Sequence, residues 1–177
     1  MQYITHYESS FGGILLAADE AGLTGLWFDG EKYYAHNLAK NHREGNTPVL
    51  DKTKRWLDAY FSGRKPDFMP PIHMNGSPFR MEVWNLLLQI PYGETTTYGE
   101  LAKIFAKRKN LTRMSAQAVG GAVGHNEISI IVPCHRVVGA NGSLTGYAGG
   151  ISTKVKLLEL EKADMRNFFV PKKGTAL

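Results

Sequence analysis

Residues 97–124 read TYGELAKIFAKRKNLTRMSAQAVGGAVG. Thr97 and Glu100 have the spacing of a capping box, which predicts a helix over Tyr98–Phe105. A basic loop follows, and a run of small residues then forms a second predicted helix, Ala116–Gly124. Two short helices joined by a loop are typical of a helix-turn-helix, so this stretch predicts a mainly α-helical second half of the chain.

Two adjacent glycines interrupt the second predicted helix. Gly120 and Gly121 should each weaken a helix by about 1 kcal/mol relative to alanine, so their presence needs a reason. One reason is the close approach of another backbone, of protein or of nucleic acid, and the other is tight packing between helices. We favour packing for either glycine alone, and less strongly for the pair.

Positive charge is concentrated in the same half of the chain. Residues 1–76 carry 8 Lys and Arg against 9 Asp and Glu, whereas residues 77–177 carry 13 against 7, a net charge of +6. The cations of the basic loop are Lys107, Arg108, Lys109 and Arg113. A polyanion such as nucleic acid would meet this half first, although a solvated basic surface accounts for the charge equally well.

The first part of the chain has the pattern of a small sheet with one helix. Apolar and aromatic residues fill three predicted strands separated by turn-like segments, namely Gln2–Ser9, Gly13–Ala18 and Gly22–Phe28. Residues 32–46 are polar and are expected to form a loop. Thr47 and Pro48 then predict the start of a helix, and Gly63 predicts its end.

A predicted linker divides the chain into two domains. Residues 64–76 contain three prolines and few apolar residues, which places the boundary near Asn75, between domains 1–76 and 77–177. With 177 residues, 43% of them hydrophobic, the chain can form a substantial core. No apolar run approaches the roughly 18–20 residues of a membrane helix, and no signal-peptide pattern opens the chain. We therefore expect an α+β protein without membrane association.

The segment after the second predicted helix carries the only cysteine. Glu127–Val132 is predicted to be a buried strand that runs into Pro133, Cys134, His135 and Arg136. A cysteine after a buried strand is usually a small core side chain. Its uniqueness, the preceding proline and the two polar neighbours in apolar surroundings favour chemistry instead. A single thiol excludes an internal disulfide and a multi-thiolate zinc site, and it suits a reducing compartment such as the cytoplasm.

A thiol becomes a useful nucleophile when a nearby base takes its proton and a carboxylate orients that base. His135 is the candidate base. Glu161 is the best-placed carboxylate, because it lies four residues after Leu157 and three after Leu158 on the apolar face of a helix predicted over Ser152–Ala163, capped by its first residue. A surface salt bridge is the alternative role for Glu161, and spacing alone favours it slightly.

Six motifs in one order resemble the O6-alkylguanine-DNA alkyltransferases, also called methylated-DNA–protein-cysteine methyltransferases. The motifs are PYGE and Tyr98 within 91–98, AVGGA at 118–122, Asn126, PCHRV at 133–137, GY-x-GG at 146–150 and LL-x-x-E at 157–161. They cover Ser77–Ala163, and the ordered set is far more specific than PCHRV alone. Residues 1–76 resemble the variable N-terminal domain of the family only loosely.

The resemblance implies a ribonuclease-H-like N-terminal domain of sheet plus helix. It also implies a mainly α C-terminal domain whose winged helix-turn-helix enters the minor groove of double-stranded DNA and flips the damaged base. The reaction would move the alkyl group of O6-alkylguanine, or of O4-alkylthymine, irreversibly to the cysteine, without a metal or cofactor. Because the product is a thioether, each molecule would react once, and we expect a monomer.

The resemblance also assigns roles to single residues. Cys134 would accept the alkyl group, His135 would act as its base through a water, and Glu161 would orient His135. Asn126 would brace the active-site turn, and Tyr98 would help to turn the nucleotide and donate a proton to guanine. The residues expected in the substrate pocket are Val137, Tyr147, Ala148 and Gly149. The residues expected at the DNA are Gln117, Ala118, Gly120, Gly121, Arg113 and Arg136.

The sequence departs from the family pattern at two of these positions. Gln117 stands where the family has an intercalating arginine, so the inserted side chain brings no charge. Ala148 stands where the family has a serine, which leaves a backbone amide to contact the base. We expect the basic loop, 107–109 with Arg113, to supply phosphate contacts in compensation. The N-terminal zinc site of some relatives needs two cysteines, which this chain lacks.

Three other functions are alternatives to alkyl transfer. A relative that binds alkylated bases without accepting the alkyl group would lack the nucleophile, which Cys134 argues against. A cysteine hydrolase would use the same cysteine, histidine and glutamate, but common hydrolases hold Cys and His far apart in sequence, and a helix-turn-helix has no purpose there. A basic DNA-binding module with a core cysteine leaves the ordered motifs unexplained.

Overall fold

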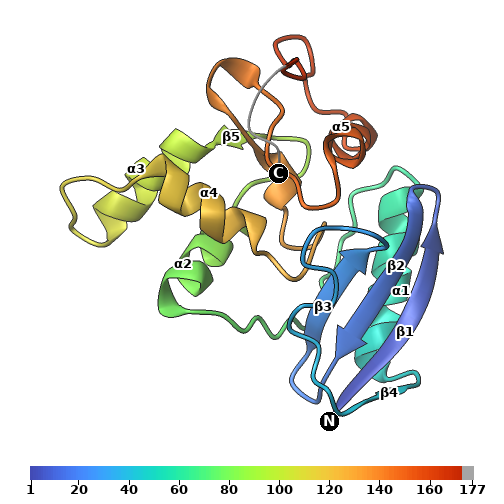
Figure 1. The fold of residues 1–177 in the computed structure, drawn as a ribbon. Helices are drawn as coiled ribbons and strands as arrows, with labels where there is room; N and C mark the ends of the chain where they lie inside the picture. The colour runs from blue at the N-terminus through green and yellow to red at the C-terminus, as the bar shows by residue number, and fades with distance from the viewer. Residues whose placement is uncertain (173–177) are drawn as a thin grey trace. The chain divides into compact units, whose positions relative to one another are not determined.

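The computed structural model describes residues 1–172, and its chain divides into two compact units (Figure 1). The first unit holds Met1–Asn75 together with the short segment Glu127–Ser129. The second unit holds Gly76–Asn126 and the chain from Ile130 onward. The last five residues of the predicted second domain lie outside the described part. Within that part, no helix is long and apolar enough to cross a membrane.

A four-stranded sheet in the order β3-β2-β1-β4 forms the first unit. Its strands are β1 (Gln2–Ser9), β2 (Gly12–Ala18), β3 (Leu23–Phe28) and β4 (His42–Glu44). The meander of the first three strands agrees with the sequence prediction, and each pairs antiparallel with the next. The fourth strand lies inside the predicted loop and pairs parallel to β1. Its three residues are exposed and polar, so no hydrophobic alternation marked it.

One helix, α1 (Pro48–Phe61), covers a face of this sheet (Figure 1). The Thr47 side chain accepts the Leu50 N–H at its start, as an N-cap residue does. Apolar side chains at helical spacing turn toward the sheet, with Leu50, Trp56, Leu57 and Tyr60 buried. Gly63 takes the left-handed conformation, φ +85°, and ends the helix as predicted.

The outer edge of β3 is closed by two short segments from later in the chain. Leu23 bridges Ile72, and Leu26 bridges Ile128, both in parallel. The prediction of a strand over Glu127–Val132 is therefore wrong: the segment is buried, but only Ile128 makes a bridge. The chain turns immediately afterwards because Ile130 adopts a left-handed backbone, φ +68°, which lies outside the extended region of regular strands.

Four α-helices lie in the described part of the second unit. They are α2 (Pro78–Leu87), α3 (Tyr98–Arg108), α4 (Ala116–Gly124) and α5 (Ile151–Leu160). The first three are capped by side chains of Ser77, Thr97 and Ser115, of which the capping box predicted Thr97. Trp84 on α2 donates its indole N–H to the carbonyl of Ala122 on α4 at 2.9 Å, which ties these helices together.

Some boundaries differ from the prediction. The helix α2 ends at Leu87, and α3 continues beyond the predicted Phe105 to Arg108. The helix α5 starts from Gly150, whose φ of +92° suits glycine, so Ser152 is not its cap. A two-stranded parallel ladder joins β5 (Thr96–Thr97) to β6 (Val137–Val138), and the short helices η1 and η2 flank β6 at Cys134–Arg136 and Ala140–Gly142.

Candidate active site

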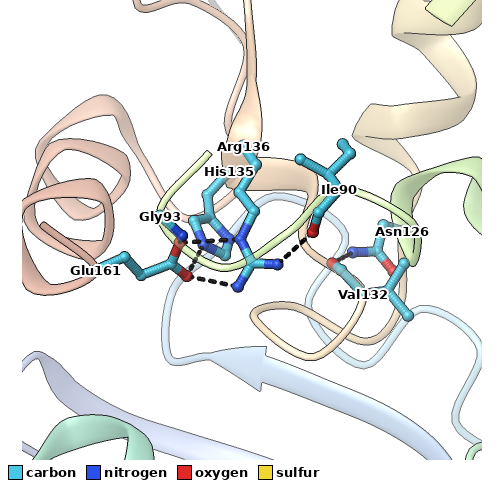
Figure 2. Close-up of polar contacts among 7 residues, drawn as sticks. All are labelled: Ile90, Gly93, Asn126, Val132, His135, Arg136 and Glu161. Carbon is cyan, nitrogen blue, oxygen red and sulfur yellow. Dashed lines mark hydrogen bonds and ion pairs between the residues drawn. The ribbon is translucent and has the colours of Figure 1, made fainter. Parts of the chain in front are cut away.

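Cys134 begins the η1 turn and is almost fully buried, with 6% of its surface exposed. Its backbone N–H donates to the carbonyl of Val132 at 2.8 Å. The Asn126 side-chain amide donates to the same carbonyl at 2.8 Å and lies 3.2 Å from the sulfur (Figure 2 shows Asn126 against Val132). Asn126 thus both braces the turn and offers an N–H to Sγ. A donated hydrogen bond favours the thiolate over the thiol.

Glu161 gathers four donors on one buried carboxylate (Figure 2). His135 Nε2 lies 2.6 Å from its Oε1, and the Gly93 N–H donates to Oε2 at 3.1 Å. Arg136 donates from Nη2 to Oε1 and from Nε to Oε2, both at 2.9 Å. Burial alone would raise the pKa of Glu161, but the hydrogen bonds and charges of His135 and Arg136 hold it well below its usual range. The group is therefore a carboxylate at neutral pH.

The backbone at Gly93 explains how the carboxylate receives its fourth donor. Gly93 has φ +77°, a left-handed conformation that favours glycine. A Cβ at this position would lie 2.9 Å from the backbone carbonyl oxygen of Glu161, closer than packed atoms tolerate. The glycine of the PYGE motif therefore allows the turn after α2 to approach Glu161.

His135 is arranged to act as a base. The ring is fully buried, and burial lowers its pKa despite the opposing effect of Glu161, so the imidazole is neutral. In the neutral form, the Nε2–H donates to Glu161 and the lone pair remains on Nδ1. Nδ1 is buried and has no hydrogen-bond partner among residues 1–172. A surface salt bridge, the alternative weighed for Glu161, does not describe this geometry.

Arg136 does not occupy the place expected for it. The sequence placed it at the DNA, whereas the structure buries it to 8% exposure. Besides the two bonds to Glu161, it donates to the carbonyl of Ile90 at 2.7 Å, and its guanidinium lies 5.7 Å from the centre of the Tyr92 ring. Its donors serve the carboxylate and the turn after α2, so we replace the DNA-contact expectation with a role in holding Glu161.

Lys154 is a site residue that the sequence reasoning missed. It is fully buried on α5 and donates to the carbonyls of Val137 at 2.5 Å and Thr145 at 2.8 Å. Burial lowers its pKa to about 8, against the opposing effect of nearby Cys134. The signal was available: Lys154 precedes Glu161 by seven residues, which places both on the same face of α5.

One tyrosine lies near Cys134 and another packs against His135. The Tyr98 hydroxyl, at the start of α3, lies 3.3 Å from the carbonyl of Thr145 and 3.2 Å from that of Gly146. Burial, and then the nearby Cys134, raise the pKa of Tyr98 above its usual value, so it remains a proton donor. The Tyr147 ring is buried edge-on to His135, with 6.5 Å between centres. The other predicted pocket residues are the buried Val137 in β6, and Ala148 and Gly149, half-buried in the loop before α5.

The exposed face of α4 is formed by small residues. Gln117, Ala118 and Gly121 are exposed, as is Arg113 in the preceding loop, while Gly120 is half-buried. A Cβ at Gly120 would make an ordinary contact, 3.6 Å from the Tyr98 ring, and one at Gly121 would meet open space. Packing among the described residues therefore requires neither glycine, contrary to the interpretation we favoured for each.

Two family models match this chain. The ribonuclease-like domain of 6-O-methylguanine DNA methyltransferase matches residues 2–74, and the DNA binding domain of that family matches residues 78–163. The chain belongs to the 6-O-methylguanine DNA methyltransferase family. The region that matches the DNA binding domain of the family contains every polar group of the site, from Gly93 to Glu161.

Individual methyltransferases resemble the chain over most of its length. The methylated-DNA–protein-cysteine methyltransferase of Methanosarcina acetivorans is 44% identical, over 90% of this chain and 97% of the relative. That of Haemophilus influenzae is 40% identical, over 90% and 86%. The crystal structure of the Mycobacterium tuberculosis O6-methylguanine methyltransferase is 40% identical with a TM-score of 0.77, over 92% of this chain and 93% of that one. A structure of the mycobacterial protein in complex with DNA gives the same TM-score, over 90% and 92%.

Proposed function

We propose that this chain repairs DNA by moving the alkyl group of O6-alkylguanine to Cys134, once per molecule. The observation that carries the proposal is the environment of one sulfur. The family is named for methylating a protein cysteine, and Cys134 is the only cysteine in the sequence. That cysteine lies beside an amide donor, Asn126, and next in sequence to a neutral histidine bound to a carboxylate.

The transfer is a displacement at the alkyl carbon. The thiol proton passes through a water to Nδ1 of His135, and Glu161 stabilises the imidazolium that forms. The thiolate forms the new sulfur–carbon bond while the carbon–oxygen bond of the substrate breaks, and the electron pair stays on the guanine. Tyr98, which its surroundings keep protonated, donates a hydrogen bond to the guanine as negative charge develops there. The thioether has no leaving group that a nearby acid or base can release, so the protein is consumed.

We further propose that the two helices α3 and α4 belong to a winged helix-turn-helix that binds the minor groove and flips the base. The exposed small residues of α4 support this, because they let a DNA backbone approach the helix closely. Gln117, exposed on the same helix, would fill the gap left by the base. In this proposal domain 77–177 binds DNA, domain 1–76 has the ribonuclease-H-like fold, and O4-alkylthymine is a second candidate substrate.

The structure divides the basic loop into two pairs of cations. Arg108 donates to Gln89 at 2.7 Å and Lys109 pairs with Glu82 at 2.7 Å, so both are engaged with α2 and the segment after it. Lys107 and Arg113, with Lys103, instead line a hollow of about 420 Å³ beside the start of α4, and no carboxylate lines it. We therefore propose that Lys107 and Arg113 contact DNA phosphates, and that the other two cations mainly fix the loop.

Intact mass spectrometry tests the main proposal. The protein is incubated with a duplex containing O6-methylguanine, and with the same duplex containing guanine. We expect a gain of one methyl group on Cys134, saturating at one per protein, with the modified duplex only. Cys134→Ala should bind the duplex and gain nothing. Binding by the native chain without a mass gain, or demethylation beyond one equivalent, would contradict alkyl transfer of this kind.

A further inference from the structure

The three residues before the Ile130 turn, Glu127–Ser129, belong to the first unit, although both neighbours along the chain belong to the second. The N–H of Leu26 in β3 donates to the carbonyl of Glu127 at 2.9 Å, and the N–H of Ser129 donates to the carbonyl of Leu26 at 3.0 Å. These two bonds satisfy the open edge of β3 at Leu26. The backbone at 127–129 is therefore fixed by the first unit.

Side chains reinforce this attachment. Trp27 is fully buried in β3, and its indole N–H donates to Glu127 Oε2 at 2.9 Å across a separation of 100 residues. The ring lies over Gly25, where any Cβ would collide with it, so glycine is required for this ring position. Glu31 is also buried; it accepts the Phe28 N–H at 3.0 Å and lies 3.5 Å from the Ser129 hydroxyl.

The residues at both ends of the segment are connected to Cys134, one by a hydrogen bond and the other by the turn that precedes it. Asn126, which precedes Glu127, offers its amide to Cys134 Sγ at 3.2 Å and to the Val132 carbonyl at 2.8 Å. Ile130, which follows Ser129, has a left-handed backbone that a β-branched residue rarely adopts. Such a conformation persists only where the surrounding structure imposes it. The fixed segment therefore sets the position of Asn126 at one end and of the turn that starts at Ile130 at the other.

We infer that the first unit acts in alkyl transfer as a positioning device, and that Trp27 and Glu127 are positioning residues for Asn126. The inference rests on the proposed function of Cys134 and gives residues 1–75 a part in it. The hydrogen bond from the Asn126 amide to the Cys134 sulfur is the contact most sensitive to a shift of the segment, because a hydrogen bond weakens steeply as its atoms separate or misalign. The titratable groups near Cys134 are Tyr98 on α3, His135 in η1 and Lys154 on α5, whereas the hydrogen-bond partner of the Trp27 indole is Glu127.

The test replaces Trp27 by Phe, which keeps a buried ring and removes the indole donor. We expect single-turnover methyl transfer to slow by about tenfold, which is the scale of one hydrogen bond. The rising limb of its pH profile should move to higher pH, since a less stabilised thiolate forms later, while the Kd for the duplex stays the same. Glu127→Gln keeps an acceptor oxygen for the indole and should retain most of the rate.

Trp56→Phe is the matched control, a buried tryptophan on α1 of the same unit, stacked on Tyr60. It should leave the rate and the pH profile unchanged even if it lowers the melting temperature. Equal slowing by Trp27→Phe and Trp56→Phe, or no slowing by either, would overturn the inference. In an Asn126→Ala background, Trp27→Phe should add no further slowing, because the positioned group is already absent; additive slowing would also overturn it.

A measurement without DNA separates this inference from the proposed function. The rate at which a small alkylating reagent modifies Cys134 is followed against pH in the native chain, Trp27→Phe and Trp56→Phe. We expect the profile to shift in Trp27→Phe alone. If the native chain takes no methyl group from DNA, the proposed function fails while this comparison still judges the positioning. If the native chain repairs DNA and Trp27→Phe matches it in both assays, only the positioning inference fails.

Discussion

His135 and Glu161 share a hydrogen bond of 2.6 Å in which neither side chain reaches solvent. The carboxylate is kept ionised by a second partner, Arg136, rather than by water. This arrangement sets the tautomer of the histidine, because the ring nitrogen that faces Glu161 must carry the hydrogen. The tautomer of His135, and with it the direction in which we expect a proton to leave Cys134, is thus determined by a residue 26 positions after the histidine, at the end of α5.

Replacing Glu161 by Gln tests this relationship. The amide keeps the shape but loses the charge, so Arg136 becomes a buried cation without its anion, and the histidine is no longer held in one tautomer. We expect single-turnover transfer to fall by about a hundredfold or more and the free energy of unfolding to fall by about 3 kcal/mol. Glu159→Gln, on the exposed face of α5, is the control and should change neither quantity.

Lys154→Met should remove the hydrogen bonds that hold the backbone at Val137 and Thr145. The variant fills similar space but leaves the carbonyls of Val137 and Thr145 without their donor, at a cost of about 1–3 kcal/mol for each buried group. We expect a lower melting temperature and slower transfer, with both effects absent in Lys156→Met on the exposed face. Full activity in Lys154→Met would show that these carbonyls need no fixed donor for the reaction.

Gly121→Ala should have opposite effects on the stability of the fold and on the affinity for DNA. The position is helical and open, so the substitution should raise the free energy of unfolding by up to about 1 kcal/mol. The added methyl group projects from the exposed face of α4, and we expect weaker binding to any duplex, measured by fluorescence anisotropy. A stabilised variant with unchanged affinity would mean that DNA does not approach the helix here.

The two pairs of loop cations give a matched comparison in salt titrations of DNA affinity. Lys107→Ala with Arg113→Ala should weaken binding to all sequences and reduce the slope of log affinity against log salt by about 0.9 for each lost phosphate contact. Arg108→Ala with Lys109→Ala removes the same charge from side chains that already bind α2 and the segment after it, so its effect should be smaller. Equal slopes for the two double variants would refute the division of the loop.

Glu31 makes stability depend on pH. Burial, aided by the charge of Glu127, raises the pKa of Glu31 to about 8. The folded state therefore holds a proton that the unfolded chain releases above its ordinary pKa of about 4.3. The free energy of unfolding should accordingly fall as the pH rises from about 5 to about 8. Urea unfolding of Glu31→Gln should show a flatter dependence over this range, whereas Glu20→Gln at an exposed position should follow the native chain.

Local signals predicted the elements that depend on local physics. The helix α4 spans Ala116–Gly124, as the run of small residues predicted. The β meander follows from apolar segments separated by turns. The position of Glu161 on the apolar face of a helix made it the best-placed carboxylate, although spacing alone slightly favoured a surface salt bridge, which its burial excludes. Cys134 stood out because it is the only cysteine and because its two polar neighbours, His135 and Arg136, are costly to bury without a purpose.

The predictions were wrong where contacts between residues distant in sequence determine the local structure. The run from Glu127 to Val132 has the composition of a buried strand, and it is buried, but its hydrogen-bond partner is a residue of β3 about a hundred positions earlier. Arg136 looked like a DNA ligand because its neighbours in sequence gave no hint of the carboxylate 25 residues later that binds it. Sequence periodicity carries no information on such pairings.

The excursion of residues 127–129 also constrains the order of folding. The strand β3 is synthesised about a hundred residues before the segment that closes its edge. Contacts so distant in sequence close a large loop, which makes them late and slow to form. The turn that holds Cys134 therefore reaches its final shape only after the earlier sheet exists to receive its neighbour. We expect a nascent or truncated chain that lacks the sheet to carry Cys134 without the contacts that fix residues 127–129.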